Sequence, residues 1–477
     1  MKSSIAFEDV LATRYASPGM VEALSPERRI RHWRRVWIAL AEAERELGLP
    51  ITAVQIAELK RNEGNLNLAV AKKREKETRH DLMAHLQAFA VLCPKAGKIL
   101  HLGATSALVT DNADLLAMRE ALERVRDLLA AWVEALARFA GRHADLACLG
   151  FTHLQPAQPT TVGKRACLWL QDLADDLCEV ERLLGKFPWL GIKGTTGTQA
   201  SFLALLGTPA KVDALERLVG KKLGFEAAFP VTGQTYPRKF DQRVTDVLAG
   251  IASSASRMSQ DVRILQHMGE LEEPFEAHQV GSSAMPYKRN PMLSERMAAL
   301  SRYVLATSLN TGLTAAVQFL ERTLDDSANR RIVIPDLFLA TDGILRLGVH
   351  VSRGLQVFPR VIESNLQREL PFSATENILM EATKKGGDRQ ALHERIRVHA
   401  HAAKKAIRES GAVNDLIGRL RADPSFSMLA GLWDRLLDPA RYVGLAPRQT
   451  CAFLESVVRP LLKRHPRAAR VKVELEV

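Results

Sequence analysis

One segment of the sequence brings small residues, hydroxyl groups and positive charge together. It runs from Gly281 to Pro291 and reads Gly-Ser-Ser-Ala-Met-Pro-Tyr-Lys-Arg-Asn-Pro. This composition predicts a mobile loop whose backbone can approach a ligand closely and whose N–H groups can bind an oxyanion, while Lys288 and Arg289 supply positive charge. Composition alone leaves a second interpretation open, which is a basic surface turn before a helix that begins near Pro291.

A histidine in a proline-rich stretch is the second candidate for proton transfer. His153 lies within residues 150–161, which read Gly-Phe-Thr-His-Leu-Gln-Pro-Ala-Gln-Pro-Thr-Thr. An imidazole has an ordinary pKa of about 6.5, which suits a group that donates a proton near neutral pH. Taken by itself, however, the residue is more typical of a capping histidine in a proline-flanked turn.

Other catalytic patterns are missing from the sequence. The cysteines are scattered and form no Cys-x-x-Cys pair, so we expect reduced thiols in the core; they are Cys93, Cys148, Cys167, Cys178 and Cys451. The glycine-rich residues 191–199 lack the ending of a phosphate loop, His393-Glu394 has no second histidine at zinc-protease spacing, and no Gly-x-Ser-x-Gly elbow occurs. We therefore expect chemistry without a metal or cofactor.

The net charge of +12 has three possible meanings: nucleic-acid binding, an anionic small substrate, or a basic surface that aids solubility. Part of the excess lies in the tail after Leu462. Aromatic residues are 6% of the chain and interleave with no basic motif, so we expect no specific nucleic-acid binding. The first residues are not those of a signal peptide and no apolar run is long enough to span a membrane, which predicts a cytoplasmic protein without membrane contact.

Helical periodicity dominates the chain and indicates an all-α fold. From Asp111 to Ala140 the apolar residues recur at spacings of three and four, with Thr110 or Asp111 as a plausible N-cap, and a second such seam runs from Val244 to Leu265. Helices of this length predict an elongated central bundle, and we expect subunit association to cover their seams. Weak strand candidates are confined to the neighbourhood of Gly191 and to residues 471–477.

Breaks in the helical pattern divide the chain into three predicted domains. Glycine and small residues interrupt it between His101 and Asp111, and two prolines interrupt it between Phe358 and Pro371. We expect an N-terminal helical domain (1–105), a central long-helix bundle (106–357) that contains the loop near 275–291, and a C-terminal helical domain with a basic tail (358–477).

The candidate loop matches the signature loop of the fumarase, aspartase and argininosuccinate lyase superfamily, Gly-Ser-Ser-x-Met-Pro-x-Lys-x-Asn-Pro, at every defining position. Its Tyr-Lys-Arg-Asn version resembles adenylosuccinate lyases in particular. Gly103–Ser106 with Asp111–Asn112 is similar to the first conserved region of the superfamily, and residues 150–161 are similar to the second. Five further segments resemble the sequences of the adenylosuccinate lyase branch that contains the animal enzymes: Arg14–Pro18, Arg79–Asp81, Lys193–Gln199, Thr232–Tyr236 and Glu321–Arg331. Only Pro237 and the basic tail depart from the pattern.

The resemblance implies β-elimination of fumarate from adenylosuccinate, giving AMP, and from succinyl-aminoimidazole-carboxamide ribotide, giving AICAR, in purine nucleotide biosynthesis. It implies that Ser282 is the base and His153 the general acid. The residues that it assigns to the succinyl carboxylate are Lys288, Asn290, Thr105, Ser106 and Gln234. Those that it assigns to the nucleotide phosphate, which suits the forked donors of arginine, are Arg14, Tyr15, Arg322, Ser327 and Arg331. Further substrate-binding positions are Arg79, His80, Asp81 and Arg296, of which His80 would orient the substrate or His153.

The resemblance also implies a homotetramer whose sites each draw residues from three chains. Three other interpretations compete with this one. The chain could be another lyase of the superfamily, such as a carboxymuconate cycloisomerase or argininosuccinate lyase, although the phosphate-binding arginines favour adenylosuccinate lyase. It could be a structural protein like the lens crystallins of this fold, against which the intact Ser282, His153 and Lys288 argue. The net charge keeps a nucleic-acid-binding protein as a third alternative.

Overall fold

A computed structural model describes residues 8–276 and 278–475 of the chain. The N-terminal part is a group of short helices around one longer helix. Its elements are η1 (Leu11–Tyr15), α1 (Pro18–Leu24), α2 (Pro26–Glu46), α3 (Ala53–Asn62), α4 (Leu68–Thr78), α5 (Asp81–Leu92) and η2 (Gly97–Ile99). The helix starts follow from side-chain caps: Ser25 accepts the N–H of Arg28 ahead of α2, and Pro26 occupies the first helical turn.

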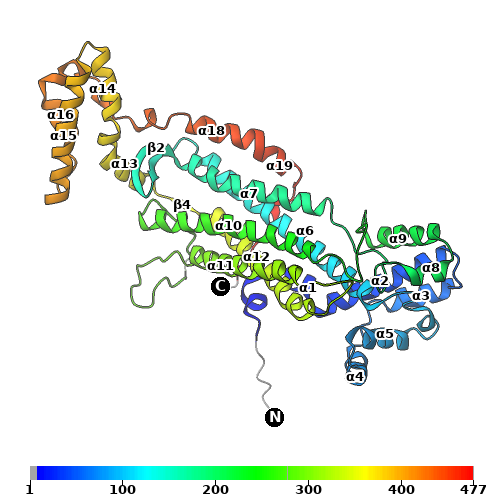
Figure 1. Cartoon of the computed structure of the whole chain (residues 1–477). Helices are drawn as coiled ribbons and strands as arrows, with labels where there is room; N and C mark the ends of the chain where they lie inside the picture. The colour runs from blue at the N-terminus through cyan, green and yellow to red at the C-terminus, as the bar shows by residue number, and fades with distance from the viewer. Residues whose placement is uncertain (1–7, 277, 476–477) are drawn as a thin grey trace.

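The middle of the chain forms a bundle of long helices that lie along one axis (Figure 1). These helices are α6 (Ser106–Arg142), α7 (Val162–Leu184), α10 (Lys239–His267), α11 (Met292–Ala316) and α12 (Asp326–Gly354). Two shorter helices, α8 (Ala200–Leu206) and α9 (Pro209–Leu223), pack near α2 at one end of it. The predicted all-helical fold with an elongated central bundle is therefore confirmed. No helix within the described residues is both long and apolar enough to cross a bilayer.

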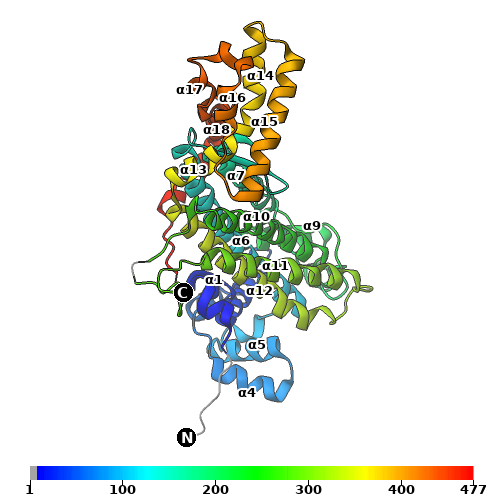
Figure 2. The same ribbon diagram turned by 90° about the vertical axis from the view of Figure 1, so that its left-hand side faces the viewer.

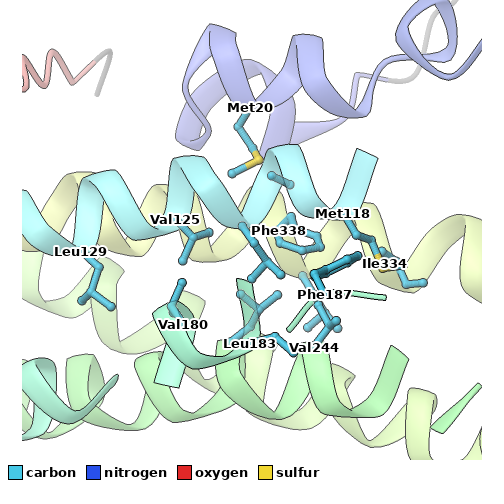
Figure 3. Packing of buried hydrophobic residues seen from close by; sticks show 14 of the residues in the cluster. Met20, Met118, Val125, Leu129, Val180, Leu183, Phe187, Val244, Ile334 and Phe338 are labelled. Carbon is cyan, nitrogen blue, oxygen red and sulfur yellow. The ribbon is translucent and has the colours of Figure 1, made fainter. Parts of the chain in front are cut away.

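The core of the bundle is continuous from α1 to α10. Figure 3 shows Met20 of α1, Met118 and Val125 of α6, Val180 of α7 and Val244 of α10 converging in it. All of these side chains are buried, and Gly348 lets α12 approach Trp132 of α6 so closely that an added Cβ would lie 2.4 Å from the indole ring. Interlocking of this kind fixes the helices relative to one another.

The structure corrects the expected role of the two helical seams. The apolar residues from Leu115 to Phe139 and from Val244 to Leu265 are buried against other helices of the same chain, so they need no second subunit to cover them. The exposed apolar face lies elsewhere, on α11 and the segment after it; its members are Leu305, Leu309, Leu313, Val317, Phe319, Leu320 and Leu324.

Two helix boundaries also differ from the prediction. The first long helix begins at Ser106 with Thr105 as its N-cap, rather than with Thr110 or Asp111. The break expected at Pro371 is absent, because that proline lies two residues before the end of α13 (Pro359–Ser373), which passes into α14 through Ala374.

Strands are few and short. The hairpin of β1 (Ala147–Thr152) and β2 (Gln155–Thr161) leads from α6 to α7, and β3 (Leu271–Glu272) pairs with β4 (Gln356–Val357). The weak candidate near Gly191 corresponds to a single parallel bridge between Trp189 and Ala228. Residues 471–475 of the tail candidate form no strand, and 476–477 lie outside the described residues.

The C-terminal helices form a second hydrophobic cluster that stands away from the bundle (Figure 2). The elements after α13 are α14 (Thr375–Lys384), α15 (Arg389–Ser410), α16 (Leu416–Ala422), η3 (Pro424–Leu429), α17 (Trp433–Leu436), η4 (Pro439–Arg441), α18 (Ala446–Phe453), η5 (Leu454–Val458), α19 (Arg459–Lys463) and η6 (Ala468–Arg470). The cluster extends from Ala374 to Leu436, whereas α18, α19 and η6 return to pack on α6 and α7.

Candidate active site

A cavity of about 780 Å³ lies where α5, α6 and α12 begin. Sequence reasoning predicted eight of the residues that line it, and these come from four separate segments: His80, Asp81, Thr105, Ser106, Gln234, Arg322, Ser327 and Arg331. The start of a helix carries unpaired N–H groups and the positive end of the helix dipole, so three helix starts at one cavity favour an anionic ligand.

His80 and Asp81 hold the rim of this cavity together. The Nδ1 atom of His80 accepts the N–H of Met83 at 3.4 Å, which leaves Nε2 facing the Ser106 hydroxyl at 3.3 Å. Asp81 accepts a hydrogen bond from Arg331 at 2.8 Å. Burial opposes ionisation of Asp81, but the N–H of Leu82 and the Arg331 guanidinium outweigh it and lower the pKa of this carboxyl group.

A buried ionic network forms part of the cavity wall. Arg238 donates to Asp111 of α6 at 2.9 and 3.2 Å and to Asp326 of α12 at 2.5 Å, and all three side chains are buried. Arg322 also donates to Asp326, at 3.4 Å. The network joins the three segments that carry Ser106, Gln234 and Ser327, so it fixes the distances between their side chains.

A second buried arginine extends the network along the cavity wall. Arg330 donates to Asp241 at 2.7 Å and to Asp114 at 3.2 Å, and its third nitrogen meets the Tyr236 hydroxyl, which donates to Asp241 at 2.6 Å. Sequence reasoning missed these residues as well as Asp111, Arg238 and Asp326, although a polar residue at a buried helical position, such as Asp111 at the start of the first seam, was a usable signal.

Arg29 of α2 is a further lining residue that the sequence did not indicate. Its guanidinium lies 5.3 Å from the ring centre of Trp33, and its buried Nε atom has no hydrogen-bond partner among the described residues. It adds positive charge to the cavity wall.

The signature loop lies away from this cavity, between β3 and α11. The Ser282 hydroxyl oxygen accepts the N–H of Met285 at 3.1 Å, an arrangement that stabilises negative charge on that oxygen. Asn290 donates to the carbonyl of Gly281 at 2.8 Å and so closes the loop on itself, while Lys288 is exposed. An added Cβ at Gly281 would lie 2.3 Å from the Lys288 carbonyl, which explains the need for glycine there.

Glu273 holds the two ends of the loop together. Its buried carboxylate accepts the N–H groups of Leu293 and Ser294, at 2.8 and 2.9 Å, and the Ser294 hydroxyl at 2.8 Å. The carboxylate therefore caps the N-terminus of α11 from the other side of the loop.

His153 lies at the tip of the β1–β2 hairpin and is exposed. His153 and Leu154 form a two-residue turn in which both have positive φ, 54° and 57°. Such a turn favours glycine or asparagine, so the hairpin holds a histidine and a leucine in a strained conformation at a solvent-exposed tip.

The long helices keep these parts of the chain apart. Ser106 begins α6 and the hairpin follows its end; α6 has 37 residues, which at about 1.5 Å each span about 55 Å. Gln234 and Arg238 precede α10 and the signature loop follows it; α10 has 29 residues, which span about 43 Å. Figure 1 shows the hairpin and the loop at the bundle end opposite α5 and α9. One chain therefore brings neither His153 nor Ser282 to the cavity.

The remaining predicted residues do not line the cavity. Tyr15 is half-buried against the bundle, and Arg14 is exposed beside it at the end of η1. The start of the same segment does line the cavity, through Asp9 before η1 and Ala12 within it. Arg79 is the exposed C-cap of α4 next to His80, with a φ of 54°. Arg296 lies in the second turn of α11, close in sequence to the signature loop.

Comparison with known proteins adds a separate line of evidence. A family model described as Lyase matches residues 23–306, and another, described as Adenylosuccinate lyase C-terminus, matches residues 371–453. The adenylosuccinate lyase of Schizosaccharomyces pombe is 46% identical over 461 residues, which cover 96% of each chain. The chain belongs to the adenylosuccinate lyase family. An adenylosuccinate lyase from an animal, Schistosoma mansoni, is 45% identical with 96% of each chain covered.

Solved structures outside the adenylosuccinate lyase family share the fold. The 3-carboxy-cis,cis-muconate lactonizing enzyme from Pseudomonas putida superposes with a TM-score of 0.81 at 23% identity, covering 97% of this chain and all of that one. This likeness concerns the fold alone. Among the described residues of this adenylosuccinate lyase family member, no three His, Cys, Asp or Glu side chains gather where they could hold a metal ion.

Proposed function

We propose that the protein eliminates fumarate from adenylosuccinate, giving AMP, and from succinyl-aminoimidazole-carboxamide ribotide, giving AICAR. The observation that carries this proposal is the match at 45–46% identity to adenylosuccinate lyases over 96% of the chain. The cavity supports it chemically, because helix starts and several arginines surround a space suited to an anionic nucleotide.

In this proposal, Ser282 removes the proton from the carbon beside a succinyl carboxylate. A serine hydroxyl is ordinarily too weak an acid to act as a base, so the alkoxide needs stabilisation from donors such as the Met285 N–H and from nearby positive charge. The C–N bond then breaks, and His153 donates a proton to the departing nitrogen. Fumarate and the purine-pathway amine leave, and no metal or cofactor takes part.

The other predicted residues bind and orient the substrate. Thr105, Ser106 and Gln234 at the cavity, together with Lys288 and Asn290 of the loop, would hold the succinyl carboxylate. Arg322, Ser327 and Arg331, with Arg14 and Tyr15, would hold the phosphate. His80 contacts Ser106 and so would orient the carboxylate pocket, with Arg79, Asp81 and Arg296 around it.

We further propose a homotetramer in which each site combines the cavity of one chain with the hairpin and the loop of others. The lengths of α6 and α10 support this arrangement, because they hold the three parts apart within a chain. The exposed face on α11 supports association: Leu309 and Leu313 are each 67% exposed and Leu320 is 93% exposed. Apolar surface of this kind is typical of an interface.

The activity is tested by following fumarate release from each substrate by absorbance, with argininosuccinate as the control. We expect turnover of both succinyl nucleotides and none of argininosuccinate. A chain that released fumarate only from argininosuccinate would contradict the proposal.

We also propose a cytoplasmic location, the three-domain division at residues 105 and 357, and no specific binding to nucleic acid.

A further inference from the structure

The last part of the chain returns to the bundle and lies along α12. After η6 packs against α6, residues 471–475 run extended over the surface; we call them the C-terminal strap. Val471, Val473 and Leu475 pack against the main core, whereas Lys472 and Glu474 are exposed. This alternation is that of an extended segment with one buried face.

Two arginines of α12 bind the strap through its backbone. Arg353 donates to the carbonyl of Val471 at 2.8 Å, and Arg346 donates to the carbonyl of Glu474. Seven residues of α-helix rise about 10 Å, and three residues of extended chain also cover about 10 Å. The two arginines therefore match the spacing of the two carbonyls, with the strap antiparallel to the helix.

Arg346 also binds the segment before α1. Its second terminal nitrogen donates to the carbonyl of Tyr15 at 2.5 Å, and the side chain is buried. One turn earlier in α12, Asp342 accepts the N–H and hydroxyl of Ser17, at 2.5 and 3.1 Å. Between them, Gly343 permits close approach, since an added Cβ would lie 3.0 Å from the Cβ of Tyr15.

The segment held in this way forms one wall of the cavity. Asp9 and Ala12 line the cavity, and Asp9 caps η1 by accepting the N–H of Leu11 at 2.9 Å. The turn is closed by the N–H of Ala16, which donates to the Leu11 carbonyl at 2.9 Å. Tyr15 is the last residue of η1, so the Arg346 contact fixes the end of the wall that is farthest from Asp9 in sequence.

We propose that Arg346 and the C-terminal strap position the η1 wall of the substrate cavity, so that the strap controls substrate affinity without touching substrate. The inference rests on the proposed function, because it takes the cavity as the substrate site. A buried guanidinium that joins two carbonyls loses its fixed direction when one of them is removed, and Tyr15 then loses its anchor.

The test combines steady-state kinetics with hydrogen exchange on the full enzyme. The variants are Arg346→Met, Arg346→Lys, and a chain that ends at Arg470; Arg353→Met is the matched control, because it removes a strap contact but leaves the Arg346 bridge. We expect Arg346→Met and the shortened chain each to raise KM for adenylosuccinate about tenfold, with kcat within about twofold. The KM of Arg346→Lys should lie between the KM of these two variants and that of the wild type. Arg353→Met should change KM less than about twofold.

Hydrogen exchange over residues 9–17 measures, without substrate, how firmly the η1 wall is held. We expect faster exchange in Arg346→Met and in the shortened chain, and combining the two changes should add little, because they disrupt one contact. Unchanged KM and unchanged exchange in folded variants would overturn the inference, as would faster exchange with unchanged KM. If the wild type released no fumarate from adenylosuccinate, the proposed function would fail, and the exchange data would still decide whether the strap holds η1.

Discussion

Arg238 donates hydrogen bonds to Asp111 and Asp326, which belong to two different helices, α6 and α12, and all three groups are buried. Replacing this arginine with methionine would leave the buried Asp111 without an arginine partner and Asp326 with only the longer contact to Arg322. We expect Arg238→Met to lower the free energy of unfolding by about 3–5 kcal/mol and to reduce activity with it. Thermal and urea unfolding measure the loss.

The exposed pair Arg257–Asp172 is the matched control for that experiment, since its side chains are 46% and 33% exposed. Arg257→Met should cost less than about 1 kcal/mol. Equal losses in the two variants would mean that the buried network does not hold the helix starts together.

The two loop serines should differ in their effect on catalysis. Ser282 accepts the Met285 N–H, whereas Ser283 is exposed. We expect Ser282→Ala to nearly abolish turnover while substrate still binds, and Ser283→Ala to be milder. Single-turnover rates and equilibrium binding check this, and the reverse order would mean that the wrong hydroxyl has been assigned.

Mixing two inactive variants tests the shared site. If His153 and Ser282 of one site come from different subunits, exchange between His153→Ala and Ser282→Ala tetramers leaves about a quarter of sites with both native residues by random assortment. Activity should rise with exchange time toward roughly that fraction of wild type. Each variant taken through the exchange alone is the control. Verified mixed tetramers that stayed inactive would place both residues in one chain.

The exposed face on α11 should be the surface that holds subunits together. We expect the double change Leu309→Glu and Leu313→Glu to shift the enzyme to smaller species in sedimentation velocity, because burying two carboxylates at an interface is unfavourable. Activity should fall in parallel. Val398→Glu, at a site on α15 that is 46% exposed, is the control and should leave the assembly unchanged. A double variant that sedimented like the wild type would rule out this face as the interface.

Glu44 should make stability depend on pH. Its carboxylate is buried with no hydrogen-bond partner among the described residues, and desolvation raises its pKa to about 8. The folded state keeps this proton where the unfolded state has lost it, so stability falls as pH rises from about 5 to about 8. Relative to Glu44→Gln, the wild type should lose about 1.4 kcal/mol per pH unit in that window. The exposed Glu27→Gln on the same helix should show no such slope; a flat difference for Glu44→Gln would refute the assignment.

Much of the fold could be predicted because long helices carry a repeated signal. Thirty residues of regular apolar spacing identify α6 whatever its surroundings, and the lack of glycine and proline between Asp111 and Ala140 agrees. Its start at Ser106 could not be placed in the same way, because small and polar residues near Gly103 are compatible with both loop and first turn. The sequence also could not show which helix keeps an exposed apolar face. A helix has the same apolar periodicity whether its apolar residues pack against the same chain or against another subunit.

Eight of the predicted site residues line the cavity, but their arrangement could not be predicted. The motif residues were found because their types and order are informative, yet their grouping depends on helix lengths and packing. His80 and Ser106 meet through the fold of α5 against α6, and the Arg238 network needs three segments that are up to 215 residues apart, Asp111 and Asp326 at the extremes. Local sequence holds no signal for contacts of that range.

The separate hydrophobic cluster between Ala374 and Leu436 has a calorimetric consequence. A group of helices with its own core can melt while the long-helix bundle stays intact, so heating should not convert native to unfolded chains in one cooperative step. The enthalpy measured by scanning calorimetry should then exceed the van't Hoff enthalpy from the shape of the transition. Substitutions in α15 would move one part of the heat-capacity curve and leave the part that belongs to the catalytic bundle in place.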